Sequence, residues 1–312
     1  MDFAPGDPFA YTNTGAPLLG LVIAAVTGTP FEEFVAENLF RRAGLTSTRF
    51  QHQPNLVTHR AGGYVNSVGT LKNGEPLRPT VIAPSGGILS TAKDLVQWMH
   101  LLGSGKVLQP ASVATMTAPM RLNSGSTFSA GMGWFLDEFR GHPLLLHNGS
   151  TVGGFSSVIY WYPRERLGVA VLMNVDRFNA VNTLATLVAG VVMPGLSIAS
   201  LAERPDPDPA LTQRLLSMLN AVATGRDSEL LASNIRIPGA ASRMRRDFGF
   251  AGRPDRFTFL EREEGPANGA PRFGNVIRSI HRYRLVSAGR VINYTFEVTP
   301  EGTVARLIAE AQ

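Results

Sequence analysis

Proline alternates with aspartate from position 205 to position 209, and this short segment constrains the fold of the chain more than any other. Proline lacks a backbone N–H and has a fixed φ, so neither a helix nor an inner strand can run through such a segment. A chain of 312 residues is also long enough for two domains. We therefore expect a first domain over residues 1–200, a proline–aspartate linker over 201–210 and a small second domain over 211–312.

The composition narrows the kinds of partner and chemistry. The 29 basic residues outnumber the 24 acidic ones, but both kinds are spread over the two halves of the chain, so we expect no nucleic-acid binding. The absence of cysteine excludes a disulfide framework, a thiolate nucleophile and a cysteine-based zinc site. The longest apolar stretches, residues 18–26 and 184–193, are too short to cross a bilayer, so we expect no membrane span.

Helical patterns open the chain. Apolar residues recur at helical spacing over residues 18–25, and the glycines at 28 and 44 are placed to end this helix and the next one. A third helix is predicted to begin at Thr91, whose hydroxyl can cap it, with Asp94 at the spacing of a capping box.

Three later stretches have the composition of strands: residues 143–147, 155–162 and 167–173. The last is apolar on both faces, which is typical of a strand covered by helices from both sides, and a helical pattern over 178–192 is one candidate cover. Residues 163–166 read as a hairpin loop between the last two strands, which makes this pair antiparallel. This region therefore predicts an α/β (α+β) fold in which helices flank an antiparallel sheet.

The region after the linker has its own pattern. His281 lies there among Arg278, Arg282 and Arg284, and we interpret this charged strand as a solvated face rather than an anion site. One helix followed by four strands predicts a small α+β accessory domain, with the helix over 211–224 and the strands near 256–262, 275–286, 290–298 and 303–309.

Three short clusters contain residues that could do chemistry: Tyr11 to Asn13, residues 84–94, and His147 to Gly149. Each alone is a weak signal, since a second Tyr-x-Asn occurs at 64–66. Taken singly, packing roles for Tyr11 and His147 are the simpler interpretation. Their order along the chain carries more information than any one of them.

These clusters belong to a longer set of segments between residues 3 and 176. In order, the segments are YTNTG (11–15), TGTPF (27–31), AGLTST (43–48), SGG to Asp94 (85–94), GMGW (131–134), HNG (147–149) and VLMN (171–174). With these segments the chain resembles the serine beta-lactamase and penicillin-binding-protein superfamily, nearest the group of class C beta-lactamases, D-aminopeptidases and related esterases. The resemblance implies a partial beta-lactamase-like fold with an accessory domain.

The resemblance also implies acyl transfer through a serine ester. Tyr11 would be the acid/base, Asn13 a polar group that orients it, and His147 the side chain of the third motif. Gly149 and Ser150 would contact the substrate, with the Ser150 N–H donating to the oxyanion. We expect no metal and no organic cofactor, a small-molecule or peptide ester or amide as substrate, and the periplasmic or secreted location usual for the bacterial family, although no signal peptide is recognisable in this chain.

Histidine stands at 147 where many relatives would have lysine. With an unperturbed pKa near ~6.5, histidine is mostly neutral at pH 7, so it binds a substrate carboxylate less firmly than a lysine ammonium does. This replacement favours an esterase, amidase or peptidase over a dedicated penicillin hydrolase.

The nucleophile is the family element that does not fit. The family's Ser-x-x-Lys precedes its Tyr-x-Asn, whereas here Tyr11 is near the first residue, and the single Ser-x-x-Lys, Ser90 to Lys93, comes later at a predicted helix start. We interpret Ser90 and Thr91 as capping residues, and the chain as the C-terminal portion of the fold with an open sheet edge. We therefore expect it to be inactive alone, the missing segment coming from a partner chain or being lost from a split gene.

Two other interpretations stay open. In one, the chain is a non-catalytic relative that binds peptide or cell-wall fragments in the retained cleft. In the other, Ser90 is the nucleophile and Lys93 is its base.

Overall fold

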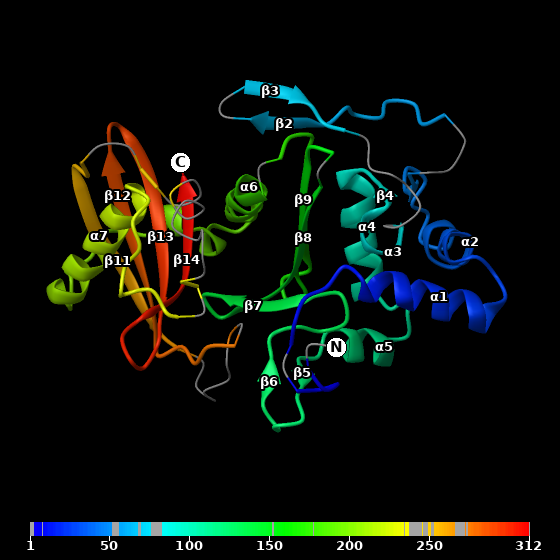
Figure 1. Ribbon diagram of the computed structural model, residues 1–312, viewed down its shortest axis with the longest axis horizontal. Coiled ribbons are helices and arrows are strands. Elements are labelled where there is room, and N and C mark those ends of the chain that lie inside the picture. The colour runs from blue at the N-terminus through cyan, green and yellow to red at the C-terminus, as the bar shows by residue number, and fades with distance from the viewer. Residues whose placement is uncertain are drawn as a thin grey trace. The chain divides into compact units, whose positions relative to one another are not determined.

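The computed structural model of the protein describes most of the chain (Figure 1). Its internal contacts divide it into two compact units, Met1–Ser124 with Ala130–Val188, and Gly125–Ser129 with Ala189–Gln312. This division falls between Val188 and Ala189, and the linker over 201–210 remains a prediction. The described residues are 3–7, 9–51, 56–67, 70–75, 83–151, 153–176, 178–233, 235–236, 245, 249–250, 253–265, 272 and 274–311.

The first unit contains the helices predicted at the start of the chain. α1 (Gly15–Thr27) ends at Gly28, whose φ of 68° is left-handed, and Gly44 has a φ of 64° just after the next helix. Glycine ends a helix in this way because a side chain is strained at such angles. The remaining helices are α2 (Phe31–Val35), its π-helical continuation η1 (Ala36–Arg41), α3 (Ala83–Gly86), α4 (Ala92–Gly103), α5 (Pro110–Met116) and α6 (Phe178–Val192).

Helix α1 is apolar and largely uncovered. A Cβ at Gly20 would lie 2.9 Å from Pro84 Cγ, so α1 approaches α3 closely at this point. No single described helix is long and apolar enough to cross a membrane; only α1 and α2–η1 taken together, bent by 81° at their break, reach that length and composition. The exposed fractions of five large apolar side chains on α1 are 58% for Leu18, 65% for Leu19, 68% for Leu21, 56% for Val22 and 81% for Val26.

The main sheet has the order β10-β9-β8-β7, and all neighbours are antiparallel. The strands predicted over 155–162 and 167–173 are confirmed as β9 (Phe155–Tyr162) and β10 (Leu167–Met173), and β10 lies at one edge of the sheet. The strand predicted over 143–147 is longer, β8 (His142–Thr151), and β7 (Phe135–Phe139) was not predicted. The shorter strands are β1 (Arg49–Phe50), β2 (Tyr64–Ser67), β3 (Thr70–Asn73), β4 (Ile88–Leu89), β5 (Met120–Arg121) and β6 (Thr127–Phe128).

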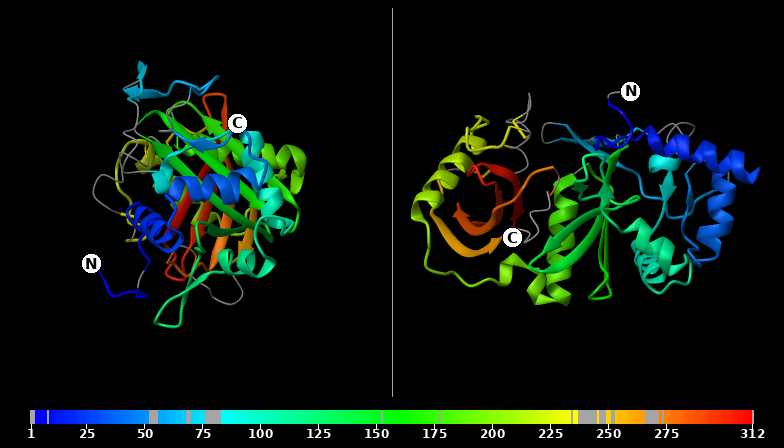
Figure 2. Two further views of the ribbon diagram at one scale, coloured as in Figure 1. Left: turned by 90° about the vertical axis from the view of Figure 1, so that its right-hand side faces the viewer. Right: turned by 90° about the horizontal axis from the view of Figure 1, so that it is seen from below.

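Helices α4 and α6 lie on opposite sides of this sheet (Figures 1 and 2). On the α6 side Val181 and Ala185, one helical turn apart, are fully buried. Leu172 of β10 remains 41% exposed, so the two-sided cover predicted for this strand is only partial. The core on the α4 side consists of Met99, Leu102, Trp134, Leu145 and Trp161.

The segment Ser90 to Lys93 forms the start of α4 and caps this helix. Thr91 Oγ1 accepts from the N–H of Asp94 at 3.2 Å, which confirms Thr91 as the cap. The buried Asp94 carboxylate does not complete a capping box: it accepts from Ser47 N and Thr48 Oγ1, at 2.9 and 2.8 Å. It thereby anchors the turn before β1 to α4, a long-range contact that helix spacing cannot reveal.

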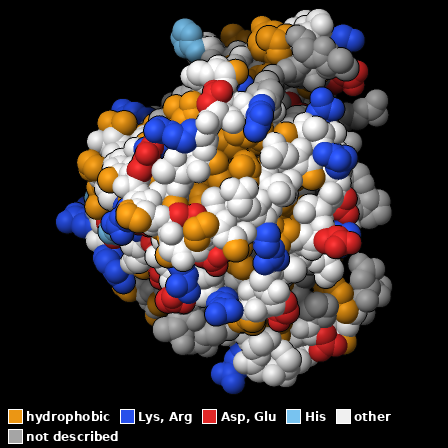
Figure 3. Space-filling view, turned by 90° about the vertical axis from the view of Figure 1, so that its left-hand side faces the viewer, with side chains coloured by type: hydrophobic (Ala, Val, Ile, Leu, Met, Phe, Trp, Pro, Cys, Tyr) orange, Lys and Arg blue, Asp and Glu red, His pale blue; other side chains and the backbone are white. Residues whose placement is uncertain are grey.

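The second unit packs one long helix against a four-stranded sheet of order β11-β12-β13-β14. Asp208 caps α7 by accepting from Leu211 N at 3.0 Å. Basic and acidic side chains are interspersed over the described face in Figure 3. The elements are η2 (Pro194–Leu196), η3 (Ile198–Ser200), α7 (Pro209–Ala223), β11 (Arg256–Glu264), β12 (Ser279–Ser287), β13 (Arg290–Val298) and β14 (Val304–Ala311), and the core includes Leu215, Met218, Leu219, Tyr283, Tyr294 and Phe296.

The interpretation of β12 as a solvated face was wrong. Arg282 is 2% exposed and its Nη1 lies 2.6 Å from Glu261 Oε1, while His281 is buried and 2.9 Å from Ser279 Oγ. Arg284 donates to Asn293 Oδ1 and to backbone carbonyls of η3 and the residue after it. Alternation predicts which side chains share a face of a strand, but it does not reveal whether another segment covers that face.

Glu310 extends this buried polar layer at the sheet edge. It pairs with Asn293 across β13 and β14, it is 3% exposed, and its Oε2 has no hydrogen-bond partner among the described residues. Burial raises the pKa of Glu310 to about 7, although the positive charge of Arg282 lowers it in part.

We predict that Glu310→Gln changes how the free energy of unfolding depends on pH. A carboxyl whose pKa rises from 4.5 to about 7 on folding binds protons more tightly when folded, so it makes the folded state less stable as pH rises from about 4.5 to about 7. The glutamine variant lacks this loss and should gain up to about 3 kcal/mol over the wild type between pH ~4 and pH ~8. Urea unfolding across this range measures the difference.

The matched control for this experiment is Glu229→Gln, because Glu229 is an exposed carboxylate in the same unit. Its stability should follow the wild-type pH dependence. An unchanged pH dependence in Glu310→Gln would contradict the assignment of a buried, unpaired carboxyl.

Candidate active site

The structure brings Tyr11 and His147 together from distant parts of the first unit. Tyr11 lies in the segment before α1 and His147 on β8, and their ring centroids are 6.1 Å apart. Phe135, the first residue of β7, contacts both rings at centroid distances of 6.0 and 5.7 Å, and Phe9 packs edge-on against Phe135 at 6.4 Å. The sequence singled out Tyr11 and His147 but missed the two phenylalanines. The one sequence signal for them was that Phe135 directly follows the GMGW segment.

Asn13 lies beside the Tyr11 phenol. The phenol donates to Asn13 Oδ1 at 3.2 Å, and Tyr11 is 55% exposed, so its hydroxyl is accessible. The Thr14 N–H donates to Thr12 Oγ1 at 3.0 Å, which shapes the turn that leads into α1. The two residues that the motif predicts as partners are therefore hydrogen-bonded to each other.

The His147 ring has a defined tautomer. Its Nδ1 lies 3.0 Å from the carbonyl oxygen of Asn148. Because a carbonyl only accepts, Nδ1 carries the proton, and in the neutral ring Nε2 is an acceptor. Burial among the aromatic rings lowers the pKa of His147, although the hydrogen bond to Asn148 opposes the shift. At neutral pH the side chain of the third motif is therefore an uncharged imidazole.

The end of β8 has a free edge beside this ring. β7 pairs only with residues 142–146 of β8, ending with Phe135 opposite Leu146, whereas β9 stays paired with β8 as far as Thr151. Among the described strands, none continues the ladder along the outer side of residues 147–151. The backbone groups on that side have no strand partner among the described residues, although the Asn148 carbonyl accepts from the His147 ring.

The turn after β8 determines which backbone groups face that edge. The backbone of Gly154 has a left-handed φ of 81°, and its N–H donates to Thr151 O at 3.0 Å. The register closes this short hairpin with the pair Thr151 and Phe155, and a closing pair beside a turn of this kind is of the hydrogen-bonded type. Because bonded and non-bonded pairs alternate along an antiparallel ladder, we infer that the N–H of Ser150 points to the free edge.

Gly149 and Ser150 differ in their surroundings. A Cβ at Gly149 would lie 3.2 Å from Ser157 Oγ, so this position packs tightly against β9. The exposed Ser150 donates from Oγ to Asp176 Oδ1 at 2.9 Å. Asp176 is a further residue that the sequence missed, since its only signal was its place two residues after the VLMN segment.

Ser90 and Lys93 lie elsewhere in the unit. Ser90 Oγ is 2.8 Å from Thr48 Oγ1, within the network around Asp94, and Lys93 is an exposed residue in the first turn of α4. The second Tyr-x-Asn begins β2, where the backbone of Tyr64 pairs with Val175. Neither motif contributes to the cluster around Tyr11.

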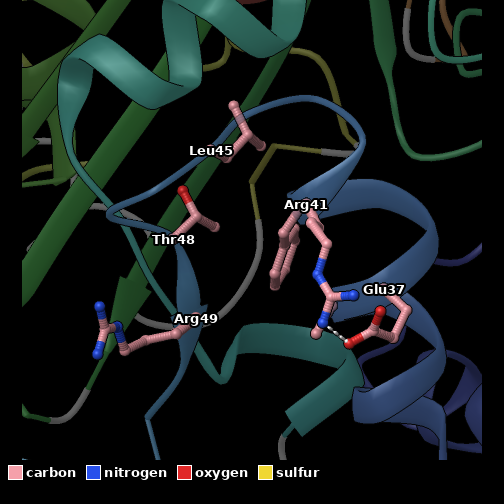
Figure 4. Close-up of a pocket in the computed structure, with 7 residues that line it drawn as sticks. Glu37, Arg41, Leu45, Thr48 and Arg49 are labelled. Atoms are coloured by element: carbon pink, nitrogen blue, oxygen red, sulfur yellow. Dashed lines mark hydrogen bonds and ion pairs between the residues drawn. The ribbon is translucent and has the colours of Figure 1, made fainter.

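A separate hollow of about 250 Å³ lies between η1 and β1. Arg41 forms an ion pair with Glu37 at its wall, and Arg49 points away from both (Figure 4). None of the predicted site residues lines this hollow. No group of three or more potential metal-ligating side chains occurs among the described residues.

Comparison with known proteins establishes the family. Residues 1–192 match the family model described as Beta-lactamase. The chain belongs to the beta-lactamase family. The resemblance inferred from the ordered segments is therefore confirmed.

Three relatives show how far the likeness extends. Penicillin-binding protein 4* of Bacillus subtilis (strain 168) is 27% identical over 184 residues, which cover 55% of this chain and 41% of that protein. A penicillin binding protein from Bacillus halodurans is 26% identical with a TM-score of 0.52, covering 61% of this chain and 58% of that one. The octameric penicillin-binding protein homologue from Pyrococcus abyssi is 19% identical with a TM-score of 0.53, covering 99% and 64%.

The share of this chain that is covered differs between these relatives. The chain spans less than half the length of the B. subtilis relative. The P. abyssi structure shares the fold, and its alignment extends over nearly all of this chain, the second unit included.

We predict that the His147 imidazole titrates below its ordinary value of 6.5 because it is buried. The midpoint is measured from the imidazole shifts in NMR spectra, with His147→Gln to assign the signal. In Phe135→Ala the ring loses part of its cover, and the midpoint should rise toward 6.5. A wild-type midpoint at or above 6.5 would contradict the buried environment.

Proposed function

We propose that this chain carries the tyrosine–histidine half of a serine hydrolase site that cleaves an ester or amide through an acyl-enzyme. The nucleophilic serine and its lysine would come from a segment outside these 312 residues. The observation that supports this most directly is the adjacency of Tyr11 and His147 beside the free edge of β8, in a unit that matches the family.

The proposed reaction assigns a step to each group. As the serine oxygen attacks the substrate carbonyl, its proton passes to the Tyr11 oxygen while the phenol proton passes to the amine of the incoming lysine. The Ser150 N–H donates to the oxyanion that forms. The Tyr11 phenol then gives its proton to the departing alkoxide or amine and regains one from the lysine ammonium, and water repeats the sequence to release the acid.

Uncovered surfaces support the idea that another segment packs on this unit. α1 exposes a row of leucine and valine side chains, and β10 is an edge strand. Large exposed apolar patches and open strand edges are typical of surfaces that another segment covers. The relatives are longer than this chain, which is consistent with such a segment.

The neutral imidazole favours a substrate without a carboxylate beside the scissile bond. A fixed ammonium would attract such a carboxylate, whereas a half-buried, uncharged His147 offers only a hydrogen-bond acceptor at Nε2. We therefore propose an uncharged ester or amide as the preferred substrate.

Labelling with a fluorophosphonate probe tests the proposal. We predict no labelling of this chain alone and covalent labelling when it is expressed with its upstream coding sequence. In the longer form Tyr11→Phe should slow labelling by about 100-fold or more, the usual size of a general acid–base contribution. Tyr64→Phe, which removes the exposed hydroxyl of the second Tyr-x-Asn, is the matched control and should label at the wild-type rate.

Other outcomes would overturn the proposal. Labelling of the isolated chain that Ser90→Ala abolishes would make Ser90 the nucleophile. Binding of peptide or cell-wall fragments without labelling of either form would identify a non-catalytic relative.

A further inference from the structure

The hairpin β2–β3 packs backbone against backbone on the turn that ends β8. A Cβ at Gly63 would lie 1.9 Å from the carbonyl oxygen of Gly153, and one at Gly74 would lie 2.1 Å from the same oxygen. A Cβ at Gly154 would lie 2.5 Å from backbone atoms of Tyr64. Only glycine fits at these three positions, so the two backbones are in direct contact.

The same hairpin is hydrogen-bonded to the segment after β10. Tyr64 N donates to Asn174 O at 2.9 Å, and Asp176 N donates to Tyr64 O at 3.1 Å. Asn174 Nδ2 also donates to Gly62 O at 2.9 Å. Residues 174–176 therefore act as a short parallel neighbour of β2, bridged at Val175.

Asp176 connects this arrangement to the candidate site. Its backbone N–H is bonded to the hairpin, while its carboxylate accepts from Ser150 Oγ at 2.9 Å. Ser150 lies one residue before the closing pair of the β8–β9 turn, where β7 no longer supports the strand. The side-chain bond to Asp176 thus restrains a residue that has a ladder partner on one side only.

We propose that Asp176 is a positioning residue that holds Ser150, and with it the direction of the Ser150 N–H, by linking this residue to the hairpin β2–β3. The inference rests on the proposed function, in which that N–H donates to the oxyanion. Side chains at odd and even positions of a strand point to opposite faces, so the carboxylate bound to Ser150 lies on the face away from His147. The hydrogen bond, rather than the negative charge, carries the effect.

Ester hydrolysis by the longer form tests this inference. Asp176→Ala should lower kcat about tenfold and leave KM within about twofold, because an oxyanion contact is made in the transition state and not in the bound substrate. Asp176→Asn keeps an oxygen acceptor and should stay within about threefold of the wild type. Ser150→Ala should match Asp176→Ala, and the double variant should be no slower than either, since both changes break one interaction.

A control and a second measurement separate positioning from general destabilisation. Glu75→Ala removes an exposed carboxylate at the end of the same hairpin and should leave kcat unchanged. In this chain, the heteronuclear NOE of the Ser150 amide should fall in Asp176→Ala and stay at the wild-type value in Asp176→Asn.

The outcomes distinguish the two proposals. A longer form that does not hydrolyse esters counts against the proposed function, and the Ser150 amide measurement then decides the positioning role alone. An unchanged Ser150 amide in Asp176→Ala overturns the inference, and so does a loss of kcat in Asp176→Asn equal to that in Asp176→Ala.

Discussion

The antiparallel ladder between β8 and β9 is the constraint on which the candidate site depends. Its register places Gly149 opposite Ser157 and closes the hairpin at Thr151 and Phe155. A shift by one residue would exchange the two faces of β8 and remove His147 from the aromatic cluster. The same shift would turn the Ser150 N–H toward β9. The tight turn and the buried partners of β9 therefore determine both the side chain and the backbone group that the proposed chemistry uses.

The two units are stabilised in different ways. In the first unit an apolar core lies between the sheet and α4, while α1 leaves most of its apolar side chains exposed. In the second unit one face of the sheet buries the ion pair of Arg282 with Glu261. The same sheet buries the Glu310 carboxyl, whose Oε2 has no hydrogen-bond partner among the described residues. A buried ion pair of this kind adds little to the free energy of unfolding, but removing one partner lowers that free energy by several kcal/mol. The second unit should therefore be sensitive to single charge changes and to pH.

Sequence reasoning succeeded where the signal was local. The strands over 155–162 and 167–173 and the cap at Thr91 were predicted because alternation, turn residues and a hydroxyl at a helix start depend on neighbouring residues. It failed for β7, whose short strand follows a glycine-rich segment. For β12 it predicted the strand near 275–286 but not the burial of its charged side chains. Tyr11 and His147 were found through an ordered set of family segments, whereas Phe135 and Asp176 carried no comparable signal.

By itself the sequence determined the family, the main helices and strands, and the presence of a neutral third-motif histidine, since these follow from residue order and side-chain chemistry. Only the tertiary structure decided which groups meet. It brought the Tyr11 phenol to the His147 ring, joined Ser150 to Asp176, and left one edge of β8 free. These contacts connect residues far apart in the chain, and they depend on how sheet, hairpin and helices pack, which no local pattern encodes.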